Sequence, residues 1–237
     1  MNLLFTGPSA LINEWIAVCD EHHCFVYSRD AKKHLSKNAA HVHALDDADE
    51  PDLIFNLHVA PTEKRKELLS ELVGSTRNSV PVLCNSVAVT VTEISTWTGK
   101  AERLAGIAAL PTLLAAETVE VAYPFGSERR HHDVLAEFFA SIGKRVEVVA
   151  DEIGLVFPRL LCMIINEAVL AVQQGVASED AIESSMKLAV NYPRGPLAWG
   201  SAIGWKHVLC IVNALHVTLG DDRYRPAPLL RKMALIE

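Results

Sequence analysis

Two patterns of hydrophobic positions divide this chain of 237 residues. As far as about Asp151, short apolar runs typical of buried strands alternate with stretches whose apolar side chains recur at helical spacing. Strands are expected at residues 2–6, 24–27, 52–59, 80–85, 119–123 and 145–149, and helices at 9–19, 62–73 and 128–141, while 91–97 and 104–110 continue the alternation. Such alternation predicts a doubly wound α/β fold, with a parallel sheet covered by helices on both faces.

The rest of the chain is expected to be helical throughout. Its first helix covers residues 155–174 and stops before Gly175, which suits the left-handed position that ends many helices. Ser178 is placed as the N-cap of the next helix, and Pro196 in the first turn of a third. The last two helices are expected at residues 205–219 and 226–235. The predicted domains are residues 1–152 and residues 153–237.

Composition and charge narrow the classes of function. Half of the residues are apolar and 22% are charged, and the net charge is −7 because 29 acidic residues outnumber 22 Lys and Arg. This balance is ordinary for a globular protein and disfavours nucleic acid or an anionic membrane as a partner. Five scattered cysteines without a Cys-x-x-Cys pair indicate a reducing cytoplasm, and no signal peptide is expected at the amino terminus. The most apolar segment, residues 153–172, contains Arg159, Asn166 and Glu167, so it is predicted as a buried helix and not a membrane span.

The helical part carries a series of motifs in a recognisable order. These read Gly154-Leu-Val-Phe-Pro-Arg, Asn166-Glu-Ala, Gly175-Val-Ala-Ser-Glu-Asp, Pro193-Arg-Gly-Pro and Asp222-Arg-Tyr-Arg-Pro. In order and spacing they resemble the C-terminal domain of the 3-hydroxyacyl-CoA dehydrogenase family. The resemblance implies a Rossmann-like N-terminal domain, oxidation of 3-hydroxyacyl-CoA thioesters with NAD in fatty acid metabolism, and a homodimer formed through the all-α C-terminal domain.

The cofactor motif of such a fold is altered here. A doubly wound sheet binds a dinucleotide through Gly-x-Gly-x-x-Gly, whose glycines let backbone N–H groups approach the pyrophosphate. Gly7 keeps the first glycine, whereas Ser9 obstructs the second position and Ile12 fills the third, where its bulk is expected to push the helix outward. The acidic residue for the ribose falls at Ser28, and Arg29 after it either binds the 2′-phosphate of NADP or is a solvated loop residue. The segment that follows is short for the family, so the helix between the second and third strands is expected to be missing or trimmed.

The resemblance also covers residues 81–123, more weakly, and with residues 154–159 this stretch aligns with the family's catalytic residues. In the family a His accepts the proton of the 3-hydroxyl as hydride leaves for NAD, a Glu orients that His, and a Ser and two Asn hold the substrate and the His. On this register the His position is Ala108, the Ser position is Val87, and the Asn positions are Pro111 and Pro158. Four of the five polar roles have therefore been lost.

Two polar residues of the aligned segment remain candidates. Glu120 holds the position of the dyad carboxylate, and it either keeps that role, lies solvated at a strand end, or pairs with an Arg such as Arg159. Asn85 either contacts the substrate or forms a turn. The paired histidines, such as His41-x-His43, have no recognised metal spacing, so solvated side chains are predicted and no metal site.

Three functions remain open on these residues. The first is a pseudoenzyme that keeps the dimeric scaffold for binding or regulation. The second is a weakly active or altered-specificity NAD(P)-dependent oxidoreductase for 3-hydroxyacyl-CoA-like substrates, and the third is a non-redox enzyme that reuses the cleft. The first is favoured because a general base typically supplies ~10²–10⁴-fold in rate and Ala108 cannot accept a proton. Acyl-CoA is the candidate ligand besides the nicotinamide.

Overall fold

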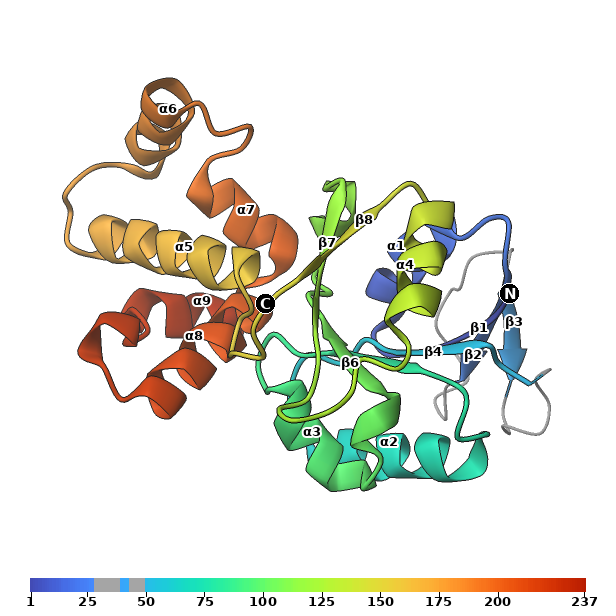
Figure 1. The fold of residues 1–237 in the computed structure, drawn as a ribbon. Helices are drawn as coiled ribbons and strands as arrows, with labels where there is room; N and C mark the ends of the chain where they lie inside the picture. The colour runs from blue at the N-terminus through green and yellow to red at the C-terminus, as the bar shows by residue number, and fades with distance from the viewer. Residues whose placement is uncertain (28–38, 43–49) are drawn as a thin grey trace. The chain divides into compact units, whose positions relative to one another are not determined.

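The computed structural model describes residues 1–27, 39–42 and 50–237. By contacts within the chain it divides into two units. The α/β unit comprises Met1–Ala109 with Leu113–Leu155, and the helical unit comprises Leu110–Thr112 with Val156–Glu237. A sheet with helices on both faces forms the first unit, and the second consists of helices (Figure 1).

The sheet has eight strands in the order β3-β2-β1-β4-β5-β6-β7-β8. Their bounds are β1 Asn2–Thr6, β2 His23–Tyr27, β3 Ala39–Val42, β4 Leu53–Asn56, β5 Val82–Asn85, β6 Leu104–Ile107, β7 Thr118–Ala122 and β8 Arg145–Val148. Neighbours are parallel except β6 and β7, which pair antiparallel. The prediction of a wholly parallel sheet is therefore wrong at this pair. Residues 108–117 join the two strands with only a short 3-10 turn, whereas a parallel crossover usually needs a helix.

Two hydrophobic clusters, one on each face of the sheet, form the core of the α/β unit. Alternate strand residues enter different clusters, as the pleat of a strand requires: Leu3 and Phe5 lie in one and Leu4 in the other. On the first face lie α1 (Ser9–Val18) and α4 (His132–Ser141), and on the second α2 (Glu63–Ser75) and α3 (Val91–Thr98). The predicted fold class is confirmed, although α4 begins later than residue 128 and β3 was not expected.

The five helices of the helical unit follow the predicted order. They are α5 Phe157–Gln173, α6 Glu179–Val190, α7 Pro196–Ile203, α8 Trp205–Leu219 and α9 Pro228–Ile236. Gly175 follows α5 with a left-handed φ of 68°, and the Ser178 Oγ accepts a hydrogen bond from the Ala181 N–H at the start of α6. Both predicted helix ends are thus confirmed. Within the described residues no single helix is long and apolar enough to cross a membrane, and only the pair α7–α8, bent by 100°, meets that criterion together.

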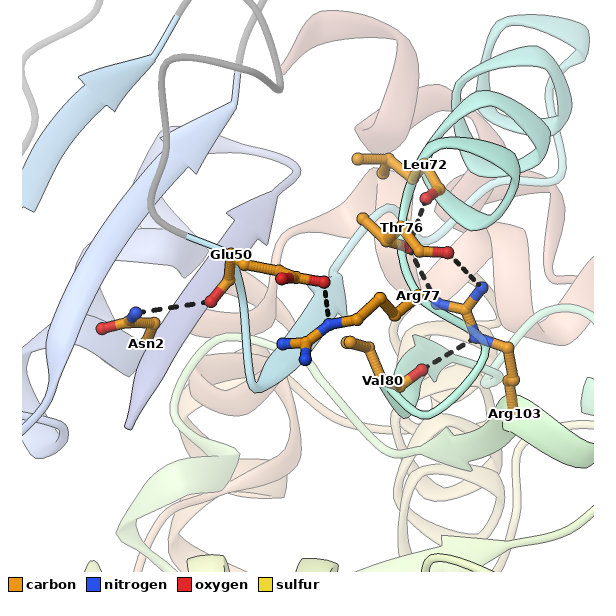
Figure 2. Close-up of polar contacts among 7 residues, drawn as sticks. All are labelled: Asn2, Glu50, Leu72, Thr76, Arg77, Val80 and Arg103. Carbon is orange, nitrogen blue, oxygen red and sulfur yellow. Dashed lines mark hydrogen bonds and ion pairs between the residues drawn. The ribbon is translucent and has the colours of Figure 1, made fainter.

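A buried arginine fastens the end of α2 to the amino ends of β5 and β6. Arg103 directly precedes β6 and is 1% exposed. Its guanidinium donates to the Val80 carbonyl at 2.8 Å, to the Val73 carbonyl at 2.6 Å and to the Thr76 hydroxyl at 2.8 Å. Figure 2 shows the bonds of Arg103 to Val80 and Thr76 beside the surface ion pair of Arg77 and Glu50. Arg103 therefore satisfies carbonyl groups that the end of a helix leaves without partners.

Candidate functional site

The loop from β1 into α1 keeps part of a dinucleotide-binding geometry. Gly7 has a φ of 148°, which L side chains rarely adopt, and a Cβ there would lie 2.9 Å from the Leu57 Cβ. Glycine is thus required by packing against the end of β4, whether or not a ligand binds. Pro8 precedes α1 without a side-chain cap, and the first turn of the helix has no acidic residue. The amino terminus of α1 therefore keeps the positive dipole end that favours an anion.

The other two glycine positions have side chains with different surroundings. Ser9 is the first residue of α1 and is half-buried. Ile12 is 1% exposed and belongs to the same core cluster as Trp15 and Phe55. Ile12 is therefore an integral part of the core, and an outward displacement of the helix stays a prediction.

Some predicted site residues lie outside the described part of the chain. These are Ser28 and Arg29 at the expected ribose site, and His43 of the histidine pair. Discrimination between NAD and NADP therefore stays a prediction. Among the described residues no group of three or more His, Cys, Asp or Glu side chains could hold a metal ion.

The carboxyl ends of β4 and β5 meet at a buried guanidinium. Arg65 lies in the run Lys64-Arg65-Lys66 at the start of α2, where the sequence favours a solvated helix face. That expectation is wrong for Arg65, which is 1% exposed. Its Nε donates to the Asn56 Oδ1 at 2.8 Å, and its two terminal nitrogens donate to the Val59 carbonyl at 3.2 Å and the Asn85 carbonyl at 2.6 Å. Asn56 and Asn85 are the last residues of β4 and β5. A sequence signal did exist, because Arg65 lies at helical spacing on the buried face of α2 with Leu69 and Leu72.

Asn85 uses its side chain within the protein. The amide nitrogen donates to the Leu57 carbonyl at 3.3 Å and to the Ala109 carbonyl at 2.6 Å, and the amide oxygen accepts from the Ala109 N–H at 3.3 Å. The residue is wholly buried. These bonds join the ends of three neighbouring strands, so Asn85 is part of the scaffold at this edge, and its role as a substrate contact stays a prediction.

Two further polar groups lie next to this network. Burial, followed by the charge of Arg65, lowers the pKa of His58 from 6.5 to about 4, so its imidazole is neutral at pH 7. The Asn56 Nδ2 and the Ser86 Oγ are buried without a hydrogen-bond partner among the described residues. Desolvated polar groups gather here, as they do at binding sites and also in rigid polar cores.

The positions aligned with catalytic residues are mostly apolar in their surroundings too. Val87 is wholly buried, and Ala108 packs against the cluster that contains Leu4 and Ile54. Glu120 is half-buried on β7. In the helical unit Pro158 stands in the first turn of α5, and the Arg159 guanidinium donates to the Tyr224 hydroxyl at 2.6 Å. Of the five aligned roles, only that of Glu120 retains an ionisable side chain.

These residues fit a dinucleotide at one end only. The amino terminus of α1 can receive a phosphate group, because glycine precedes it and no side chain caps it. At the ends of β4 and β5 the polar groups of Asn85 and Arg65 bond to the protein, and the general-base position has a methyl group. Ala108 cannot accept the proton of a hydroxyl group, so hydride transfer of the family's kind would need another base.

Comparisons with known proteins agree with the fold and the motifs. A model of the 3-hydroxyacyl-CoA dehydrogenase C-terminal domain matches residues 154–237. A 3-hydroxybutyryl-CoA dehydrogenase of Bradyrhizobium diazoefficiens is 30% identical over 207 residues, which cover 87% of this chain and 71% of that protein. A 3-hydroxyadipyl-CoA dehydrogenase of Escherichia coli K12 is 50% identical over 95 residues, or 40% of this chain and 20% of that protein.

A solved structure extends the similarity of fold over nearly the whole chain. The (S)-3-hydroxybutyryl-CoA dehydrogenase of Ralstonia eutropha aligns with a TM-score of 0.82 at 22% identity, over 99% of this chain and 93% of that one. At this identity the alignment shows the shared fold alone. Together with the sequence matches, it shows that the chain belongs to the 3-hydroxyacyl-CoA dehydrogenase family.

Proposed function

We propose that this chain is a catalytically impaired member of its family that acts as a scaffold. The proposal rests on Ala108, a half-buried residue at the position that the resemblance aligns with the family's general base. His58, the histidine beside the Arg65 network, has its pKa lowered to about 4, which makes it a weak base. Loss of a general base typically costs ~10²–10⁴-fold in rate, and efficiency falls when the pKa lies far from the working pH.

The scaffold is proposed to be a cytoplasmic homodimer. The helical unit exposes Leu188, Val217 and Leu235 by 86%, 82% and 83% of their surface. Large exposed apolar side chains are typical of interaction surfaces, and closed twofold dimers are the commonest oligomers. Light scattering after size exclusion tests the dimer, and a mass of one chain would contradict it.

The five cysteines form no disulfide, which supports a reducing compartment.

An altered-specificity NAD(P)-dependent oxidoreductase is the second candidate. Gly7 and the amino terminus of α1 favour it, because this end can receive a pyrophosphate. Two similar proteins are named as a 3-hydroxybutyryl-CoA dehydrogenase and a 3-hydroxyadipyl-CoA dehydrogenase. The substrate class to test is therefore 3-hydroxyacyl-CoA. A ligand at this end would not by itself restore the proton acceptor.

The test measures binding and turnover separately. The purified chain is titrated with NADH and NADPH by calorimetry, and 3-hydroxybutyryl-CoA oxidation with NAD is followed by nicotinamide absorbance. We expect turnover at least ~10²-fold below that of an active relative assayed in parallel. The Ala108→His variant should gain less than about tenfold, because Val87, Pro111 and Pro158 still leave the imidazole without its partners. Substantial turnover that Glu120→Gln abolishes would contradict the proposal and support the second candidate.

A further inference from the structure

We propose that Arg65 is a positioning residue that holds the carboxyl ends of β4 and β5 together. By closing this edge of the sheet with the chain's own hydrogen bonds, it prevents a dinucleotide from binding there. This inference deepens the proposed function and rests on it. In open α/β sheets ligands bind in the crevice outside the carboxyl ends of the strands. Arg65 reaches this edge from α2, and its guanidinium bonds to the last residue of each of these two strands.

The geometry of the guanidinium makes it suitable for tying strand ends together. Its planar fork holds several donors in fixed directions, so one side chain can fix several acceptors at once. Here the acceptors are the Asn56 Oδ1 on β4, the Asn85 carbonyl on β5 and the Val59 carbonyl in the loop after β4. The Asn85 amide continues the network to the Leu57 and Ala109 carbonyls. The edge is therefore organised by the chain's own polar groups.

This arrangement leaves little for a ligand to bind. Two backbone carbonyls and one amide oxygen already accept from Arg65, and hydrogen bonds to a charged group are roughly twice as strong as neutral ones. The Trp97 ring also lies against the guanidinium, with its centroid 5.7 Å from the Arg65 Cζ. A dinucleotide at this edge would have to break these bonds before making its own, so its affinity would fall.

Arg103 provides a matched control within the same unit. Both arginines are 1% exposed, and both donate to backbone carbonyls around β5. Arg65 bonds at the carboxyl end of β5, whereas Arg103 bonds to Val80 near its amino end (Figure 2). Loss of either side chain removes buried hydrogen bonds, but only loss of Arg65 opens the edge where ligands bind.

The experiment compares Arg65→Ala and Arg103→Ala in the full chain, with Arg65→Lys and Arg103→Lys as milder variants. Near-UV circular dichroism first shows which variants fold, and all later measurements use those. Hydrogen exchange then locates the opened segment, and NADH titration measures the affinity. We expect Arg65→Ala to speed exchange around residues 56–59, 85–87 and 107–109, and Arg103→Ala around residues 73–80.

The decisive readout is the affinity for NADH. We expect Arg65→Ala to bind NADH at least about tenfold more tightly than the wild type, equivalent to ~1.4 kcal/mol, while Arg103→Ala binds like the wild type. Arg65→Lys keeps the charge but loses the fork, and its gain should be smaller yet above that of Arg103→Lys. If Arg65→Ala does not fold, the two lysine variants decide. Equal NADH affinities of the folded Arg65 and Arg103 variants overturn the inference. It is also overturned if NADH binds the wild type and further slows hydrogen exchange at the ends of β4 and β5.

Failure of this inference can be told apart from failure of the proposed function. Turnover of 3-hydroxybutyryl-CoA by the wild type tests the impaired chemistry, whereas the ratio of NADH affinities between variants tests the closed edge. If the wild type turns over 3-hydroxybutyryl-CoA and the Arg65 variants bind NADH more tightly, the proposed function is rejected and the closed edge is kept. If the wild type shows no turnover and the Arg65 and Arg103 variants bind NADH equally, the closed edge is rejected and the proposed function is kept.

Discussion

Both units of this protein contain buried polar side chains that bond within the chain, but these side chains lie in different places. In the helical unit the buried Asn166 of α5 donates to the Arg225 carbonyl at 3.1 Å and accepts from the Ala227 N–H at 2.8 Å. These bonds join α5 to the segment before α9. In the α/β unit Arg65 and Asn85 bond at the edge of the sheet where such folds bind ligands. The first network joins parts of a helical bundle, and the second joins strand ends where such folds bind ligands.

Under the proposed function, the fold is kept while the catalytic site is lost. The match to the family's C-terminal domain covers residues 154–237, which lie almost wholly in the helical unit. In the α/β unit the sheet and its core are formed, although Ile12 and Ala108 stand at positions that the resemblance aligns with the family's third glycine and its general base. Hydrophobic burial holds such a sheet together without any contribution from a ligand.

Restoring a glycine at position 12 should have the largest effect on stability. Ile12 is 1% exposed in the core, so Ile12→Gly creates a cavity and places glycine inside a helix. We expect the free energy of unfolding to fall by about 5 kcal/mol, from the cost of a buried large-to-small change plus about 1 kcal/mol for glycine. Urea unfolding of the full chain measures it.

Ser9→Gly is the control for this change, because Ser9 is half-buried at the first position of α1. It should cost no more than about 1 kcal/mol. An Ile12→Gly variant as stable as Ser9→Gly would show that the glycine motif and the core are independent, and would weaken the contrast between the units.

A pH titration should show the second effect. The pKa of His58 lies at about 4 in the folded state, below its ordinary value of 6.5, because the residue is buried and lies near Arg65. The unfolded state therefore binds the proton first. The stabilisation is complete above pH 6.5 and is lost as the pH falls towards 4, by up to about 3 kcal/mol.

Urea unfolding at several pH values compares the wild type with His58→Gln. In the variant the free energy of unfolding should decline much less between pH 6.5 and 4. Some decline should remain, because the pKa values of His22 and His131 are also lowered. Identical pH profiles would mean that the hydrogen-bond network of Arg65 does not shield His58 from water. The network would then be more open to solvent than its hydrogen bonds indicate.

Much of the fold could be predicted from the sequence because its elements follow local rules. Apolar periodicity indicated most strands and helices, and Gly175 and Ser178 marked helix ends where the structure has them. Two features depend on tertiary contacts instead. The edge strand β3 exposes Ala40 and His41, so it lacks an apolar run, and the direction of β7 follows from the short connection before it.

For the candidate site, the sequence could predict only which catalytic side chains are replaced by apolar ones. The spacing of the motifs aligns Ala108 and Val87 with positions where the family has polar groups, and this alignment stays a prediction. The network of Arg65 could not be read in this way, since its acceptors are mainly backbone carbonyls of two strands. Only the fold brings those carbonyls to one guanidinium.

The helical network should respond to a single substitution at Asn166. In Asn166→Ala the Arg225 carbonyl and the Ala227 N–H lose their partner in a buried setting. We expect a fall of about 2 kcal/mol in the free energy of unfolding, about 1 kcal/mol for each bond. Asn213→Ala on α8, which loses one exposed bond to Arg231, is the control and should change stability by less than about 0.5 kcal/mol. Equal effects would mean that the Asn166 bonds are replaced by water.

The smallest effects should come from two helix caps with the same geometry. The Thr62 Oγ1 accepts from the Arg65 N–H at 3.3 Å, and the Ser178 Oγ accepts from the Ala181 N–H at 3.3 Å. Replacing either by Ala removes about 1 kcal/mol of helix stability. Because α2 packs in the core and α6 has no buried residue, Thr62→Ala should lower the free energy of global unfolding, whereas Ser178→Ala should only speed hydrogen exchange within α6. A global loss from Ser178→Ala would instead show that α6 unfolds together with the rest of the helical unit, as it would if a second copy of the chain covered it.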